Sequence, residues 1–408
     1  MKIHQYKLYL FPKEDIHCGF GVQQGNILPS MSCVPGRVVR AGLAGWAVKR
    51  GLLKADDALF ETLFFSEDET LDFVISYPFC TLKGYEPAPC SLFKLKGSGT
   101  DPVSEYFKRD DYEGIVKNDI QNVENFPVDF LCQDFMPSES DKKLNPARGC
   151  IYDPDPDNPD REVFLKSAAP LRIDLRNHHE DYGRVGEKSL FAEESLPATN
   201  IRRPKKRFYS GLLNFKEDEK INKIFSKLIN DEFMIPDFIF PVPSNPFHIF
   251  FLGHRRVPVV IYAEDLGCID TDKDILPFEY RSLNEKSEFT WTAMSDYKPV
   301  EGSCYPLNAR MIKKELPFGQ LKKIKCFCAR DFSYGYDVVN NRKLPSEQVL
   351  KAGSCGLFEY DPGELSDEGK TRKIWEKSLT GAGKSCKDGF GRFRINWKIH
   401  KLQQVDHE

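Results

Sequence analysis

The order of strand-like and helix-like segments repeats along the 408-residue chain, and this order most narrows the folds that it can adopt. Strand, helix, strands, helix and strand follow one another in the first half, and the residues after Asp265 repeat that order loosely. This is the order of the split β-α-β motif. It predicts an α+β protein with two domains of similar plan, 1–265 and 266–408.

Two helices in the first half have the clearest apolar faces. One follows Val34-Pro35-Gly36 and buries Val39, Leu43, Trp46 and Ala47, which fall at i, i+4, i+7 and i+8. The other follows the candidate cap Asp218. The remaining predicted elements are strands Ile3–Phe11, Phe208–Phe215, Ile249–Leu252, Val257–Tyr262, Phe289–Ala293 and Lys322–Arg330, a strand pair around Leu350–Tyr360, helices 306–315 and Leu365–Leu379, and a final strand Phe390–Trp397.

Residues 84–165 break the apolar periodicity and are predicted to be a loop-rich insertion in the first domain. Within them, Asp153–Asp160 mimics the start of a calcium loop but has Asn158 at the glycine position and Phe164 at the position of the closing glutamate. Residues 178–199 form a charged hairpin or loop. The first segment predicts no calcium site. In the second, His178-His179-Glu180-Asp181 leaves a metal or a general base open as the alternative to a surface segment.

Charge, hydropathy and cysteine spacing argue against a globally basic protein, a membrane or secreted protein, and a protein built around a Cys-x-x-Cys motif. Lys and Arg number 58 against 61 Asp and Glu, so a polyanionic partner must be held by local patches. No apolar run is long enough to span a membrane or serve as a secretory signal, which predicts a soluble, cytoplasmic protein without a membrane partner. The twelve cysteines contain no Cys-x-x-Cys, so they are expected to be reduced and mostly buried.

A glycine-rich, basic segment, Gly381–Arg394, lies between the last helix and the last strand. Glycine lets the backbone approach a ligand closely and present amide donors to phosphate oxygens, which Lys and Arg neutralise. The segment is not a nucleotide-binding P-loop, because Ser378 occupies the position of the first glycine and the order helix, loop, strand is reversed. The alternative is a hairpin without a ligand.

Two other basic features point to a polyanion. The run 202–207 places five cations in six residues and predicts a track along an RNA backbone, the alternative being a solvated connection. Arg37 and Arg40 lie in the first turn of the first helix, where they oppose the helix dipole unless an anion neutralises them.

Four segments in order resemble the CRISPR-associated RAMP superfamily. They are the Val34-Pro35-Gly36 helix start, the segment 178–211 with Tyr209-Ser210-Gly211, the strand start Ala352-Gly353-Ser354, and the loop 381–394. The resemblance implies two ferredoxin-like, RRM-like domains. It covers both ends and the middle of the chain and leaves 84–165 unmatched.

Length and motif order are most similar to the type III-D member of the superfamily, which is related to the subunit that caps the guide RNA. The resemblance implies a cytoplasmic, non-catalytic subunit that holds the 5′ handle of the CRISPR guide RNA without a cofactor. Its partners would be the large signalling subunit, the backbone RAMP subunits and, indirectly, target RNA. The predicted RNA-binding residues are Arg37, Arg40, Arg202, Arg203, Lys205, Lys206, Arg207, Gly381, Gly383, Lys384, Ser385, Lys387, Gly389, Gly391, Arg392 and Arg394.

Two alternatives stay open. An endoribonuclease of the same superfamily could use a histidine to move a 2′-hydroxyl proton, and His17, His178, His179 and His254 are candidates, as Asp111 and Asp181 are for target cleavage. An unrelated scaffold protein would carry the glycine-rich loop without any ligand.

Overall fold

The computed structural model describes about two thirds of the chain in several stretches. These are residues 1–19, 27–28, 30–31, 33–64, 74–75, 79–80, 85–95, 106–107, 128–129, 131–132, 144–146, 150–152, 163–166, 172–179, 185–198, 208–229, 249–252, 256–300, 305–337, 342–365 and 368–401.

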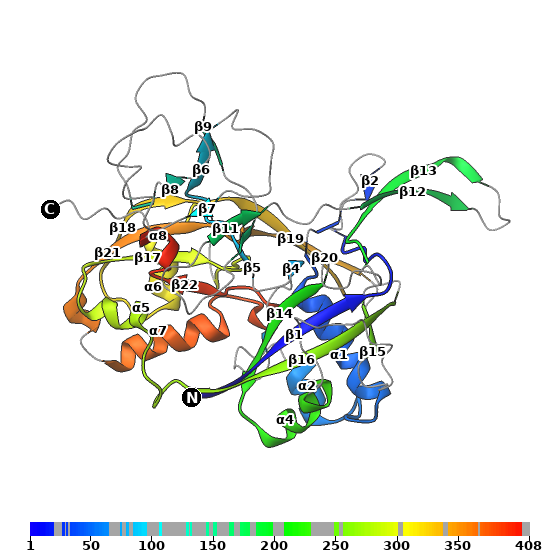
Figure 1. Cartoon of the computed structure of the whole chain (residues 1–408), viewed down its shortest axis with the longest axis horizontal. Coiled ribbons are helices and arrows are strands. Elements are labelled where there is room, and N and C mark those ends of the chain that lie inside the picture. Colours follow the sequence, from blue (N-terminus) through cyan, green and yellow to red (C-terminus); the bar gives the residue numbers. More distant parts are fainter. Residues whose placement is uncertain are drawn as a thin grey trace.

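The first of two large antiparallel sheets lies at the lower right of Figure 1, with helices against it. Its strands stand in the order β15 (Ile249–Leu252), β16 (Val257–Asp270), β1 (Lys2–Pro12), β14 (Tyr209–Lys216) and β3 (Val74–Ile75), and β4 (Phe79–Cys80) also pairs with β14. The helices of this half are α1 (Gly36–Lys49), α2 (Ala58–Phe64) and α4 (Glu219–Phe225), the last continued by the 3₁₀ turn η3 (Ser226–Leu228).

The predicted apolar face of α1 and the predicted cap of α4 are confirmed. Val39, Leu43, Trp46 and Ala47 are all buried in one core with the inward residues of β1 and β14. Asp218 caps α4, because its Oδ1 accepts the N–H groups of Lys220 and Ile221 at 2.8 and 3.1 Å.

The second sheet lies at the left of Figure 1, and its strands are also antiparallel. The order is β18 (Leu321–Phe327), β21 (Cys355–Tyr360), β17 (Glu288–Ala293) and β22 (Phe393–Ile395). Its helices and 3₁₀ turns are α5 (Phe278–Arg281), η6 (Ser282–Asn284), α6 (Ala309–Glu315), η7 (Pro362–Leu365), α7 (Glu368–Thr380), η8 (Cys386–Asp388) and α8 (Lys398–Lys401). Phe289, Trp291 and Phe358 are buried in a core separate from the first.

The chain forms the two sheets from strands and helices in the same order. The first runs β1, α1, β3, β14, α4, β16, and the second runs β17, α6, β18, β21, α7, β22. Numbered along each path, the strands stand side by side in the order fourth, first, third, second, with β15 added at the outer edge of the first sheet. The expectation of an α+β protein is confirmed, and the internal repeat is visible in the strand order.

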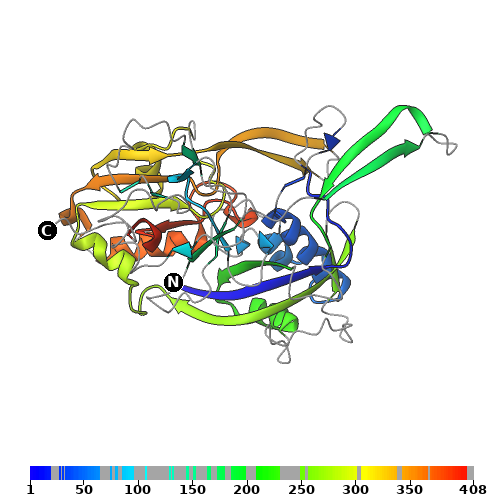
Figure 2. The same ribbon diagram turned by 45° about the horizontal axis from the view of Figure 1, so that its top comes forward.

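Two hairpins extend from this body. The hairpin of β12 (Arg172–His179) and β13 (Val185–Ser195), to which β2 (Ile27–Leu28) adds a parallel strand, projects beyond the rest of the chain in both views (Figures 1 and 2). The hairpin of β19 (Arg330–Asp337) and β20 (Arg342–Leu350) lies between β18 and β21 in the sequence. The strand predicted over Lys322–Arg330 is therefore β18 followed by the start of β19.

The predicted insertion contributes short strands to two small sheets. One has the order β5 (Tyr85–Pro87), β10 (Cys150–Tyr152), β11 (Val163–Lys166) and β7 (Tyr106–Phe107). The other has the order β8 (Val128–Asp129), β6 (Leu92–Leu95) and β9 (Leu144–Pro146). No described helix has the length and apolar composition that crossing a membrane requires.

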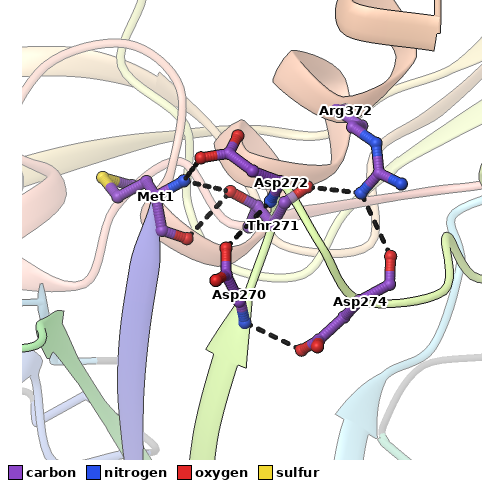
Figure 3. Close-up of polar contacts among 6 residues, drawn as sticks. All are labelled: Met1, Asp270, Thr271, Asp272, Asp274 and Arg372. Atoms are coloured by element: carbon purple, nitrogen blue, oxygen red, sulfur yellow. Dashed lines mark hydrogen bonds and ion pairs between the residues drawn. The ribbon is translucent and has the colours of Figure 1, made fainter.

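Hydrogen bonds and an ion pair join Met1, at the start of β1, to the residues that follow β16 (Figure 3). The Met1 carbonyl accepts the N–H and the hydroxyl of Thr271, both at 2.9 Å, and the Met1 amino group pairs with Asp272 at 2.5 Å. Arg372 of α7 donates to the Thr271 and Asp274 carbonyls at 2.7 and 3.0 Å. These bonds hold the first strand, the connecting turn and α7 together.

Candidate nucleic-acid interface

The structure brings together two of the predicted RNA-binding elements, the start of α1 and the glycine-rich loop 381–394. Arg40 Nη2 lies 2.7 Å from Asp388 Oδ1 in that loop. Lys387 Nζ donates to the Thr62 carbonyl of α2 at 3.2 Å, and Lys387 is only 8% exposed. The loop therefore belongs to the interface between the two halves of the chain.

The glycines of the loop are required by its packing. Gly381, Gly383, Gly389 and Gly391 all have positive φ, between 79° and 94°. A Cβ on Gly383 would lie 2.0 Å from the Lys298 carbonyl oxygen, and one on Gly391 would lie 1.9 Å from the Ala382 carbonyl oxygen. The close approach that the glycines allow is thus to the chain's own backbone.

Most main-chain amides of the loop donate within the protein. The N–H of Gly383 bonds Glu315 Oε2 at 3.0 Å, that of Lys384 bonds the Lys298 carbonyl at 2.8 Å, and that of Gly391 bonds the Asp296 carbonyl at 2.8 Å. The N–H groups of Gly381, Ala382 and Arg392 are likewise bonded. The prediction that the loop amides face phosphate oxygens is therefore wrong for these six, because acceptors of the protein already occupy them.

The basic side chains of the loop have different surroundings. Lys384 and Ser385 are exposed, whereas Lys387 is buried and Arg394 forms a two-pronged ion pair with Glu86 and lies 5.6 Å from the Trp397 ring centroid. Lys384 is the loop cation most open to a polyanion.

Arg392 is enclosed beside Arg394. Burial first, and then the positive charge of Arg394, lower the pKa of Arg392 to about 10. Its Nε has no hydrogen-bond partner among the described residues. A buried guanidinium whose Nε lacks a hydrogen-bond partner is stabilised when it binds an anion. Arg392 therefore stays a candidate for a phosphate contact.

Arg37 is half-buried near the Cys18 thiol. Burial raises the pKa of that thiol to about 12, and the positive charge of Arg37 opposes this rise.

The run 202–207 lies outside the described residues, as do His254, Asp111 and Asp181 and the side chains of His178 and His179. His17 is described, and its Nδ1 lies 2.7 Å from the Glu194 carbonyl and 3.6 Å from Glu193 Oε1. Within the described parts of the chain, no cluster of three His, Cys, Asp or Glu is placed to bind a metal.

A buried row of polar side chains that the sequence did not reveal joins Asp129, His400 and Thr292 of β17. His400 Nδ1 lies 2.5 Å from Asp129 Oδ2, and His400 Nε2 lies 2.8 Å from Thr292 Oγ1. All three residues are at most 1% exposed. Burial alone would raise the pKa of Asp129, but the charge and hydrogen bond of His400 outweigh it and hold that pKa below its usual value. These two hydrogen bonds link the insertion and the C-terminal helix α8 to β17.

Comparison with known proteins returned only structural likenesses. No family model and no curated protein matches the chain. Among solved structures, it is similar to a chain of the type III-B Cmr-beta complex bound to cognate target RNA, with 12% identity over 86% of both chains and a TM-score of 0.36.

Two further solved structures are similar at the same level. A chain of the Csm3-Csm4 subcomplex of the type III-A CRISPR-Cas interference complex has 13% identity over 88% of this chain and 93% of that one, with a TM-score of 0.32. A RAMP protein described as binding different RNA substrates has 8% identity over 96% and 99%, with a TM-score of 0.31. These scores are too low for the likeness to assign a family or a function.

Proposed function

We propose that the protein is an RNA-binding member of the RAMP superfamily and a non-catalytic subunit of a type III, III-D-like, CRISPR effector complex. In that complex it holds the 5′ repeat-derived end of the guide RNA and contacts the large signalling subunit and the backbone subunits. The observation that carries the proposal is the duplicated β-α-β-β-α-β path with one strand order in both sheets. That order is the ferredoxin-like one, and RNA-binding RRM domains are built on such a four-stranded sheet.

Two of the four superfamily-like motifs occupy matching places in the two halves. Val34-Pro35-Gly36 leads into α1, Tyr209-Ser210-Gly211 begins β14, Ala352-Gly353-Ser354 precedes β21, and the glycine-rich loop joins α7 to β22. β14 and β21 are the third strands of their respective paths. We therefore assign 1–265 and 266–408 as two ferredoxin-like domains, with 84–165 inserted in the first.

The RNA contact is made by side chains in this proposal, since the loop amides are bonded within the protein. The cations are supplied by Lys384 at the loop surface, the enclosed guanidinium of Arg392, Arg37 in the first turn of α1 and the run 202–207. Gly381, Gly383 and Gly391 position Lys384 and Arg392, because they allow the loop to pack against the backbone.

The proposal is tested by purifying the full chain after co-expression with a CRISPR array and the neighbouring effector genes, and sequencing the RNA that it retains. Guide RNAs with a repeat-derived 5′ end are the expected result. Retention of no RNA, or of cellular RNA without enrichment of guides, contradicts the proposal.

The endoribonuclease alternative is tested on repeat RNA, with and without EDTA. Metal-independent cleavage by the wild type that is lost in His17→Ala, His179→Ala or His254→Ala would replace the binding-only role with a catalytic one.

A further inference from the structure

The surface beside α6 and the start of β19 carries aromatic rings and a guanidinium in contact. Tyr305 and Phe332 are 41% and 43% exposed. The guanidinium carbon of Arg330 lies 6.0 Å from the Tyr305 ring centroid. Arg330 and Phe332 are two residues apart on β19, so their side chains leave the strand on the same face. Tyr305, Arg330 and Phe332 thus form a small exposed platform.

The helix that follows Tyr305 in the chain carries exposed cations. Helix α6 begins four residues after Tyr305 and exposes Arg310, Lys313 and Lys314. Its one acidic residue, Glu315, turns inward and accepts the N–H groups of Gly383 and Val300 at 3.0 and 3.3 Å.

The acidic side chains of the β19–β20 hairpin that lie closest along these strands are already paired. Asp331 binds Lys351 at 3.2 Å, and Glu347 binds Lys298 at 2.9 Å. Among the described residues, the exposed charged side chains of α6 and Arg330 are cationic, which favours an anionic ligand.

Exposed rings beside a row of cations match the chemistry of a single-stranded nucleic acid. Every base has a π-face that stacks on an aromatic ring or a guanidinium plane, and the cations neutralise the phosphates. A duplex hides its base faces, and an acidic peptide needs the cations but not the rings. The combination therefore favours unpaired nucleotides over either alternative.

We propose that Tyr305, Arg330 and Phe332 stack unpaired bases of RNA, while Arg310, Lys313 and Lys314 hold the adjoining phosphates. This inference rests on the proposed RNA-binding function and deepens it, because it adds a single-strand contact made by residues outside the glycine-rich loop. None of these six residues was singled out by the sequence patterns, because they come from a loop, a helix and a strand.

The test measures the affinity of the full chain for a fluorescein-labelled oligouridylate by fluorescence anisotropy over a range of salt concentrations. Phe332→Ala and Tyr305→Ala should each weaken binding by about 5- to 100-fold with little change in salt dependence, since they remove stacking and no charge. Tyr305→Phe should bind as the wild type does. Replacing Arg310, Lys313 and Lys314 by Ala should lower the salt slope by about 0.7 for each phosphate that the protein then fails to neutralise.

The matched control is another exposed ring beneath a cation. Lys49 Nζ lies 4.8 Å from the ring centroid of Phe251, which is 40% exposed, on the first half of the chain. Phe251→Ala and Lys49→Ala should leave the affinity unchanged, and circular dichroism of every variant verifies that it is folded.

The possible failures are distinguishable. A folded wild type that binds no oligouridylate and no guide RNA overturns the proposed function together with this inference. A wild type that binds, with folded ring variants that bind equally well, overturns the platform alone. Loss of affinity in the α6 charge variant but in neither ring variant also overturns it, because an electrostatic surface for any acidic partner then suffices.

Discussion

Arg40 of α1 and Asp388 of the glycine-rich loop form an ion pair of 2.7 Å that joins the two halves of the protein. Both side chains are 22% exposed, so the pair is only partly screened by solvent. In a double-mutant cycle of Arg40→Ala and Asp388→Ala, followed by urea unfolding, we expect a coupling free energy of about 1 kcal/mol. A coupling of zero would show that the ion pair does not help to hold the halves together.

The glycines of the loop should be indispensable for stability. Gly383→Ala and Gly391→Ala each place a methyl group within about 2 Å of a carbonyl oxygen at positive φ, and should lower the free energy of unfolding by about 2–4 kcal/mol. Gly51 is the control, because it also has positive φ, 66°, but no atom lies within 4 Å of the place that a methyl group would take there. Gly51→Ala should cost about 1 kcal/mol, and an equal cost at all three positions would contradict the packing role.

Two lysines of the same loop should respond differently in RNA binding. Lys384 is exposed, whereas Lys387 is buried against the Thr62 carbonyl. Lys384→Ala should reduce the salt slope of RNA affinity by about 0.7, and Lys387→Ala should leave that slope unchanged while lowering thermal stability. The reverse result in anisotropy titrations would mean that the loop rearranges when it binds RNA.

The buried carboxyl of Asp296 should make stability depend on pH. Burial, which outweighs its hydrogen bond from the Ala352 N–H, raises the pKa of Asp296 to about 6. A folded-state pKa above the unfolded value favours folding at low pH, and this advantage is lost as the pH rises from about 4 to 6. Asp296→Asn should therefore be more stable than the wild type by about 1–2 kcal/mol above pH 6 and lose that advantage near pH 4. Parallel curves across this range, measured by urea unfolding, would rule the assignment out.

Two His–Asp pairs in the described part of the chain allow a test of burial. His400 and Asp129 are buried, whereas in the pair of His4 with Asp265, at 2.8 Å, the Asp265 side chain is 40% exposed. Asp129→Asn should lower the free energy of unfolding by about 2–3 kcal/mol at neutral pH, and Asp265→Asn by less than about 1 kcal/mol.

The effect of Asp129→Asn should also fade in acid. The pKa of Asp129 is held below its usual value, so its contribution is present above that usual value and is lost as the pH falls through the folded-state pKa. Equal losses in the two variants, or a loss at Asp129 that grows in acid, would contradict this account.

The sequence predicted those features that local pattern determines. The apolar face of α1 and the Asp218 cap depend on residues within a few positions of one another, and both predictions are confirmed. The role of the loop glycines could not be predicted from local pattern. The sequence shows that Gly383 permits a close approach, but the atom that fills the space, the Lys298 carbonyl, comes from another segment.

Long-range partners account for the other differences. The acceptor of Lys387 is on α2, the carboxylate that binds Arg394 is in the insertion, and His400 of α8 binds Asp129 of the insertion. None of these pairings leaves a periodic signal in the chain. They depend on the folded structure, in which the loop contacts α1, α2 and the insertion.

The most direct test of the central claim is ultraviolet crosslinking of the full chain to guide RNA within the assembled effector complex, with the crosslinked nucleotides identified by sequencing. The account predicts crosslinks concentrated in the repeat-derived 5′ end of the guide. Crosslinks confined to the spacer-derived part, or none to this chain while the other subunits crosslink, would contradict it.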